Sequence, residues 1–111
     1  MPEPKIPAID LNAMQRAANG ACGLMKTLAN PDRLMLLCQL AHSGEMSVGE
    51  LEDALGIHQP TLSQQLTVLR DEALVDTRRD GKFVYYRVRQ GPALALVEAL
   101  YQQFCRKKKK R

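Results

Sequence analysis

The chain of 111 residues has no tryptophan and only five aromatic residues in all, three Tyr and two Phe. A hydrophobic core must therefore consist mainly of Leu, Val, Met and Ala, and the length suffices for a single domain. With 7 glycines and 6 prolines, the composition excludes a fibrous or low-complexity chain. No apolar run approaches the roughly 18 residues that a membrane-spanning helix needs. The N-terminus also lacks a charged segment followed by an apolar stretch, so we predict a cytoplasmic protein without a membrane partner.

The net charge of +4 is unevenly distributed along the chain. Residues 106–111 (RKKKKR) hold six of the 16 basic residues, which leaves 10 basic against 12 acidic residues elsewhere. A second basic concentration faces only Asp80 within residues 78–89, and consists of Arg78, Arg79, Lys82, Arg87 and Arg89. This distribution favours a polyanionic partner that is contacted at particular places. A solvated, disordered end is the alternative for the terminal run.

Proline, glycine and charge divide the chain into three parts. Residues 1–9 contain three prolines and form a flexible, extended lead-in. Residues 10–105 form one domain, and residues 106–111 form a basic C-terminal tail. Within the domain, apolar periodicity predicts helices and one β-hairpin. The helices are expected at 10–28, 31–42, 48–55, 59–72 and 92–104, and the hairpin at 75–88.

Local signals mark the helix ends. Asn30 followed by Pro31 is typical of a helix start, with a capping side chain before a proline in the first turn. Ser47 and Glu50 fit a capping box. Gly20 and Gly23 weaken the first helical pattern, although small residues also allow close helix packing. The second helix is expected to be buried on most sides, through Leu34, Met35, Leu36, Leu37 and Leu40.

The fourth helix and the hairpin each have two unlike faces. Leu62, Leu66 and Leu69 follow at spacings of four and three and predict a core face. The opposite face is polar without an acidic residue, and consists of Gln59, Thr61, Ser63, Gln64, Thr67 and Arg70. The hairpin alternates around Asp80-Gly81, a favoured turn, with Val84, Tyr86 and Val88 on one face. The last helix carries an apolar stripe of Leu94, Val97, Leu100, Tyr101 and Phe104.

Two helices joined by a tight turn and followed by a basic hairpin are typical of a DNA-binding winged helix-turn-helix, here mainly α in the order α-α-α-α-β-β-α. The second helix of the pair enters the major groove, where Gln pairs with adenine and hydroxyls bind bases or phosphates. The hairpin reaches phosphates or the minor groove. For each element alone, a polar face that merely meets water is the alternative. The residues predicted to contact double-stranded DNA are His58, Gln59, Thr61, Ser63, Gln64, Gln65, Arg70, Arg78, Arg79 and Lys82.

Three stretches, in this order, resemble the ArsR family of small bacterial winged-helix transcription repressors: LANPDRLMLLCQL, EMSVGELEDALGIHQPTLSQQLTVLRDEALV and TRRDGKFVYYRV. The resemblance covers about residues 24–105. It implies a homodimer built from the first and last helices and bound to an inverted-repeat operator. It further implies base contacts by some of Gln59, Thr61, Ser63, Gln64 and Gln65. His58 departs from the family, whose members often have a capping serine there, and leaves the start of that helix open.

The metal sites of the family do not fit this chain. The arsenic-sensing type has paired cysteines where residues 45–51 read EMSVGEL. Zinc-sensing relatives place Asp and His ligands on the last helix, where Glu98 alone could serve. His42 and His58 are expected to be surface residues without a metal. We therefore predict no metal site and no cofactor.

Cys38 and Cys105 are the candidate sensing residues. Their positions resemble the thiol-switch subgroup of the family, the sulfide- and persulfide-responsive repressors of the biofilm growth-associated type and the haemolysin-activating virulence regulators. In that subgroup, two facing cysteines form a disulfide or polysulfide bridge. Cysteine chemistry alone leaves another interpretation, a small buried residue at Cys38 and an incidental thiol at Cys105. Cys22, the third cysteine, is assigned to packing of the first helix.

These features predict a homodimeric repressor that changes its hold on the operator when reactive sulfur species or an oxidant bridge Cys38 and Cys105. Two alternatives stay open. A metal-responsive repressor would use the thiolates of the three cysteines as ligands. An architectural or anti-silencing DNA binder would sense nothing. An enzyme is not expected, because there is no glycine-rich phosphate loop and no supported nucleophile–histidine pair.

Overall fold

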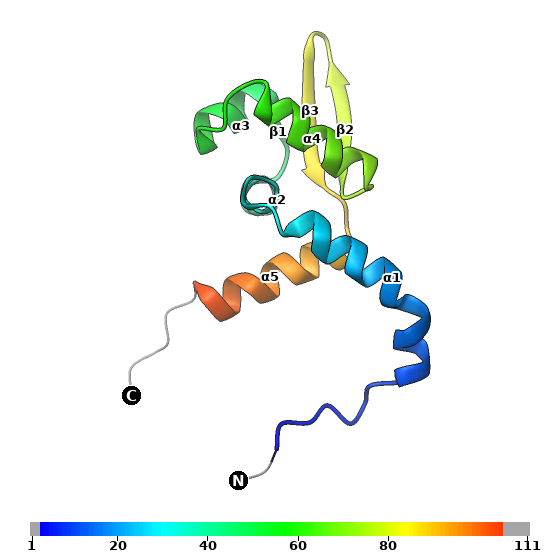
Figure 1. Ribbon diagram of the computed structural model, residues 1–111. Helices are drawn as coiled ribbons and strands as arrows, with labels where there is room; N and C mark the ends of the chain where they lie inside the picture. The colour runs from blue at the N-terminus through cyan, green and yellow to red at the C-terminus, as the bar shows by residue number, and fades with distance from the viewer. Residues whose placement is uncertain (1–2, 106–111) are drawn as a thin grey trace, which may run out of the picture.

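The computed structural model describes residues 3–105, which form a helical domain with a small antiparallel sheet (Figure 1). The predicted winged helix-turn-helix is confirmed, with one short strand added. In chain order the elements are α1 (Leu11–Leu28), α2 (Pro31–Ser43), β1 (Met46–Ser47), α3 (Val48–Leu55), α4 (Thr61–Asp71), β2 (Val75–Asp80), β3 (Phe83–Val88) and α5 (Pro92–Phe104). The predicted basic tail, residues 106–111, lies outside the described residues, as do the first two residues of the lead-in.

Helix α1 runs unbroken through both of its glycines. It begins where the Asp10 side chain accepts a hydrogen bond from the Ala13 N–H. A Cβ added at Gly20 or Gly23 would meet nothing within 4 Å, so packing within the single chain does not require glycine there. Of this helix, only Thr27 and Leu28 are buried. Its large apolar residues Leu11, Met14 and Met25 are therefore left exposed.

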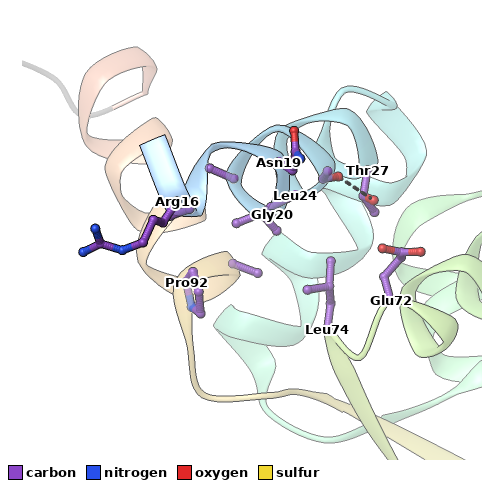
Figure 2. A pocket seen from close by; sticks show the side chains of 12 residues that line it. Arg16, Asn19, Gly20, Leu24, Thr27, Glu72, Leu74 and Pro92 are labelled. Carbon is purple, nitrogen blue, oxygen red and sulfur yellow. Dashed lines mark hydrogen bonds between the residues drawn. The ribbon is translucent and has the colours of Figure 1, made fainter. Parts of the chain in front are cut away.

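An open groove of about 830 Å³ lies between α1, the residues that lead into β2 and the start of α5 (Figure 2). Arg16 and Glu72 stand at opposite ends of it. Small or apolar residues form most of its wall, and these are Ala17, Gly20, Ala21, Gly23, Leu24, Leu74, Pro92 and Ala93. Neither a cysteine nor a histidine lines the groove.

Helix α2 is the centre of the fold and packs against α1, α3, α4, α5 and β3. The Asn30 side chain caps its start by accepting from the Arg33 N–H, as predicted. Leu36, Leu37 and Leu40 are buried in the core, where they join leucines of α3 and α4. Met35 is 47 % exposed, so the expectation that it is buried is wrong. It points away from the core because it lies off the stripe that the three buried leucines form.

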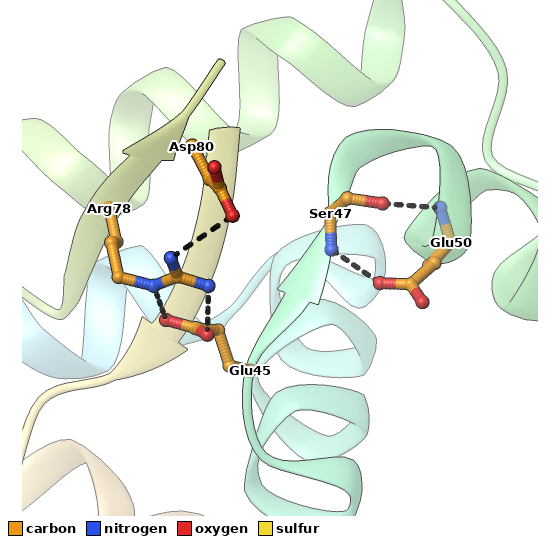
Figure 3. A network of polar contacts seen from close by, with 5 residues as sticks. All are labelled: Glu45, Ser47, Glu50, Arg78 and Asp80. Atoms are coloured by element: carbon orange, nitrogen blue, oxygen red, sulfur yellow. Dashed lines mark hydrogen bonds and ion pairs between the residues drawn. The ribbon is translucent and has the colours of Figure 1, made fainter. Parts of the chain in front are cut away.

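The predicted capping box joins β1 to α3. The Ser47 hydroxyl accepts from the Glu50 N–H at 3.2 Å, and the Glu50 carboxylate accepts from the Ser47 N–H at 2.8 Å (Figure 3). Helix α3 ends at Gly56, whose φ of 68° lies in the left-handed region that favours glycine. Helix α4 begins two residues later than expected and ends one residue earlier, because Pro60 occupies its N-cap and Glu72 its C-cap.

Replacing Ser47 by Ala should lower the free energy of unfolding by about 1 kcal/mol, because the Glu50 N–H at the start of α3 loses its acceptor. Urea denaturation followed by circular dichroism measures this change. Ser63→Ala, on an exposed face of α4, is the matched control and should change the free energy of unfolding by less than about 0.5 kcal/mol. Equal losses in the two variants would contradict the capping role.

The sheet has the order β1-β3-β2, so the wing hairpin carries a third strand that the sequence did not predict. The hairpin pairs Val75 with Val88 at its base and Asp80 with Phe83 at its tip. Its two-residue turn is therefore Gly81–Lys82, one position beyond the predicted turn, and Gly81 has a φ of 62°. Strand β1 has two residues, too short for any periodic signal, and forms only because the α2–α3 connection passes beside β3.

Apolar side chains remain exposed on α1 and α5, which lie away from the wing (Figure 1). In α5 only Ala93 and Val97 are buried. At the end of the predicted apolar stripe of α5, Tyr101 is exposed and Phe104 is 82 % exposed, so the single chain leaves this part of the stripe uncovered. The large apolar residues that α1 leaves exposed are Leu11, Met14 and Met25. No helix of residues 3–105 is both long and apolar enough to cross a membrane.

Candidate DNA interface and cysteine pair

Helix α4 presents a continuous polar face to solvent. Leu62, Leu66 and Leu69 are buried and hold the opposite side against the core, as predicted. The exposed residues of the helix are Ser63, Gln64, Thr67, Arg70 and Asp71. Within this face, the Thr67 hydroxyl donates to the Ser63 carbonyl at 2.8 Å, which leaves its oxygen free to accept from a ligand. Thr61, at the start of the helix, is half-buried.

His58 and Gln59, just before α4, have hydrogen-bonding partners within the chain. The Gln59 side-chain oxygen accepts from the Ser63 N–H at 3.0 Å and so caps the first turn of α4 in place of a serine. Its NH₂ group is left for other partners. The His58 ring pairs with Glu52 of α3 at 3.0 Å between Nδ1 and Oε2. Both side chains stay exposed at the edge of the α4 face.

Gln65 differs from the other predicted base-contacting residues. It is half-buried, and its side-chain oxygen accepts from Nη1 of Arg33 at 2.9 Å. Because Arg33 belongs to α2, the Gln65 side chain faces the body of the protein. The adjacent Gln64 side chain is exposed to solvent instead. Nothing in the sequence marks the pairing, because 32 residues separate the two partners.

Arg78 of the wing is anchored to the loop after α2. Its guanidinium donates to both carboxylate oxygens of Glu45, at 3.0 and 2.8 Å, and lies 3.8 Å from Asp80 (Figure 3). It also lies over the Tyr85 ring, 4.7 Å from the centroid. The hydrogen bonds from Arg78 hold the pKa of the Glu45 carboxyl below its ordinary range. Arg78 therefore orients the wing, and its charge is partly neutralised before any DNA arrives.

Arg89 is paired as well, with Asp76 of the neighbouring strand at 2.6 Å. This pairing lowers the pKa of the Asp76 carboxyl. Within residues 3–105, the wing cations that form no ion pair are Arg79, Lys82 and Arg87, all exposed. Arg87 still lies close enough to Glu45 and Asp76 to help lower the pKa of both carboxyls. Lys82 lies 5.9 Å from the Phe83 ring at the tip. The sequence shows five wing cations and gives no sign that they differ. Two of them, Arg78 and Arg89, form ion pairs with carboxylates that only the folded hairpin and its neighbours bring close.

The two predicted sensing thiols lie on elements that pack together, α2 and α5. Cys38 is half-buried in α2, and Cys105 is exposed at the C-cap of α5. Burial raises the pKa of the Cys38 thiol above its ordinary value, and negative charge on the nearby Cys105 raises it further. All three cysteines are free thiols. Cys22 is exposed on α1, so its assignment to packing is wrong for the single chain.

Metal ligands do not gather in this part of the protein. Among residues 3–105, no three His, Cys, Asp or Glu side chains are grouped closely enough to hold a metal ion. His58 stands beside a single carboxylate, and the thiols of Cys38 and Cys105 have no third ligand near them in the described residues.

Comparison with known proteins identifies relatives over almost the whole chain. Residues 30–77, from the start of α2 to the first strand of the wing, match the family of bacterial regulatory proteins of the arsR type. The biofilm growth-associated repressor of Agrobacterium fabrum is 57 % identical over 97 residues, which cover 87 % of this chain and 82 % of that protein. Membership of such a family also bears out the expectation that the protein is not an enzyme.

Solved structures agree with this relationship. The transcriptional repressor BigR from Xylella fastidiosa superimposes with a TM-score of 0.83 at 50 % identity, covering 89 % of this chain and all of that one. Reduced HlyU from Vibrio cholerae has a TM-score of 0.78 at 37 % identity, covering 85 % and 98 %. Fold, sequence and helix-turn-helix geometry thus lead to one conclusion: the chain belongs to the ArsR family of winged helix-turn-helix transcriptional regulators.

Proposed function

We propose that the protein is a homodimeric operator-binding repressor whose hold on DNA is controlled by a bridge between Cys38 and Cys105. Its family membership supports the repressor. The observation that carries the switch is the pair of free thiols on packed helices, close enough for the charge of Cys105 to raise the pKa of Cys38. The similarity to the biofilm growth-associated repressors agrees with this assignment.

DNA contact would divide between α4 and the wing. The exposed face of α4 enters the major groove, with Gln64 and Ser63 at base edges and Thr67 within reach of bases or phosphates. Arg70, at the end of this face, contacts the backbone. Arg79 and Lys82 contact phosphates because no carboxylate of the described chain neutralises them.

The dimer would form through α1 and α5. Both helices leave large apolar side chains exposed, among them Leu11, Met14 and Phe104, which a second copy would cover. Two glycines in the middle of α1 cost about 1 kcal/mol each relative to alanine. Because nothing in the single chain occupies the space beside Gly20 and Gly23, a closely approaching partner helix accounts for them.

A persulfide supplies the oxidation that the bridge requires. The exposed Cys105 thiolate attacks the outer sulfur of R–S–SH, forming Cys105–S–SH and releasing R–SH. The Cys38 thiolate then attacks the inner sulfur of Cys105–S–SH, which gives the Cys38–Cys105 disulfide and releases hydrogen sulfide. The two thiols lose two electrons and the outer sulfur gains them. Cys38 acts second because burial keeps more of it protonated.

The bridge would act on DNA binding through helix geometry. It ties the C-terminal end of α5 to α2, the helix that contacts both the dimer helices and α4. In a dimer, two α4 helices must fit half-sites about one turn of DNA apart, so a small rotation disturbs both. We expect a coupling of about 1–3 kcal/mol between bridge and operator.

Treating the reduced protein with a persulfide donor should weaken binding to a duplex from its own upstream region about 5- to 150-fold. Fluorescence anisotropy at one fixed salt concentration measures this, and dithiothreitol should restore the affinity. Cys38→Ser and Cys105→Ser should each bind like the reduced protein and not respond. Cys22→Ser is the matched control and should respond like the original chain.

The two alternatives give different results in the same assay. A response that survives in Cys38→Ser would refute the bridge. A response to a soft metal ion, with none to persulfide, would favour a metal-responsive repressor. Equal binding in all states, with little preference for the upstream duplex, would favour a non-sensing architectural binder.

A further inference from the structure

Arg33 lies where the end of α1, the start of α2 and the middle of α4 meet. Its Nε donates to the Thr27 carbonyl of α1 at 2.7 Å, and its Nη1 donates to the Gln65 side chain of α4 at 2.9 Å. Its own N–H is held by the Asn30 cap at 3.1 Å. One half-buried side chain therefore connects three helices with directional bonds.

The α1 end of this connection is well defined. The last four carbonyls of a helix have no partner inside the helix, and Thr27 belongs to the last turn of α1. A cation at that position satisfies the carbonyl and interacts favourably with the helix dipole. Thr27 itself is buried, and its hydroxyl donates to the Gly23 carbonyl. The bond to the Thr27 carbonyl thus holds the guanidinium in one orientation, from which it donates to Gln65 of α4.

The α4 end concerns how the helix is rotated about its own axis. Leu62, Leu66 and Leu69 hold α4 against the core by apolar contacts, which are non-directional and allow some rotation. A hydrogen bond from a planar, rigid guanidinium has a direction. Its acceptor, Gln65, is flanked by the buried Leu66 and the exposed Gln64, so it lies at the border between the core and the outer face.

We infer that Arg33 is a positioning residue that sets the rotation of α4, and that Gln65 receives this bond instead of contacting a base. The inference rests on the proposed DNA-binding function and deepens it, because it excludes one glutamine from the base-reading set. Outer residues such as Gln64 and Ser63 reach base edges at the correct angle only while Arg33 holds the helix. Operator preference, more than general DNA affinity, then depends on Arg33.

A double-mutant cycle tests the inference. Arg33→Met, Gln65→Met and the double variant are titrated, reduced, with the upstream duplex and with an unrelated duplex of equal length. Each single variant should lower the ratio of the two affinities about tenfold, and the double variant should lower it no further. Arg79→Gln is the matched control, because Arg79 lies on the wing and would contact phosphates. It should weaken both duplexes alike and leave the ratio unchanged, alone or combined with Arg33→Met.

Three results would overturn the inference. In the first, the losses of Arg33→Met and Gln65→Met add to each other. In the second, Gln65→Met relaxes the preference at one base pair only. In the third, the variants weaken binding to both duplexes equally. Arg33→Lys serves if the methionine variant unfolds, since it keeps the charge and loses the fork. If the original chain does not prefer the upstream duplex, the proposed function fails. Backbone amide NMR shifts then decide this inference: Arg33→Lys should shift amides along all of α4, and shifts confined to Gln65 would refute it.

Discussion

Replacing Leu66 by Ala should lower the free energy of unfolding by about 2–5 kcal/mol. The side chain is 1 % exposed and lies in the core with leucines of α2 and α3. Removing it costs the transfer free energy of the lost methyl groups and leaves a cavity that a core of interlocked leucines fills poorly. Because domains of this size are stable by only about 5–15 kcal/mol, the loss should be visible as a large drop in the urea midpoint.

Gln64→Ala is the matched control for Leu66→Ala, because it truncates a neighbouring residue on the exposed face of the same helix. Its free energy of unfolding should stay within about 0.5 kcal/mol of the original. A loss below about 1 kcal/mol for Leu66→Ala would mean that α4 does not depend on this side chain, and would contradict the packing described for it.

Replacing Arg79 and Lys82 together by Gln should make DNA binding much less sensitive to salt. Each phosphate that the protein no longer neutralises reduces the slope of log K against log salt by about 0.9. Because a dimer has two wings and each wing would release two phosphates, the slope should fall by about 3.6. The affinity that the variant loses relative to the original should then be about 150-fold larger at 50 mM than at 200 mM salt. Anisotropy titrations across that range measure both quantities.

Arg89→Gln is the matched control for this prediction, since it removes a wing cation that Asp76 already neutralises. It should change the slope by less than the value for one phosphate. An unchanged slope in the Arg79 and Lys82 double variant would exclude the wing tip from phosphate binding. A change as large in Arg89→Gln would mean that net charge, and not the pairing of each cation, determines the effect.

Features that depend on neighbouring residues were predicted correctly. The Asn30 cap, the capping box of Ser47 and Glu50 and the stripe of leucines on α4 all operate within a few residues. The hairpin itself was predicted from alternation around a favoured turn, but the turn lies one position further on. Each strand residue therefore pairs with a partner two positions away from the one that a turn at Asp80-Gly81 would give. The resemblance to the ArsR family rested on these same stretches, and the comparisons confirm it.

The sequence by itself therefore determined the five helices, the hairpin, their order and the polar face of α4, because helix periodicity, capping and turn preference are local. Only the tertiary structure decided which charged and amide side chains are paired within the protein and which can bind DNA. Glu45 neutralises Arg78 from 33 residues away, and Arg33 engages Gln65 across 32. Such pairs depend on how helices pack, since an ion pair or amide bond between distant residues leaves no periodic trace. Packing of α5 on α2 likewise gave Cys38 an environment that its own segment does not encode.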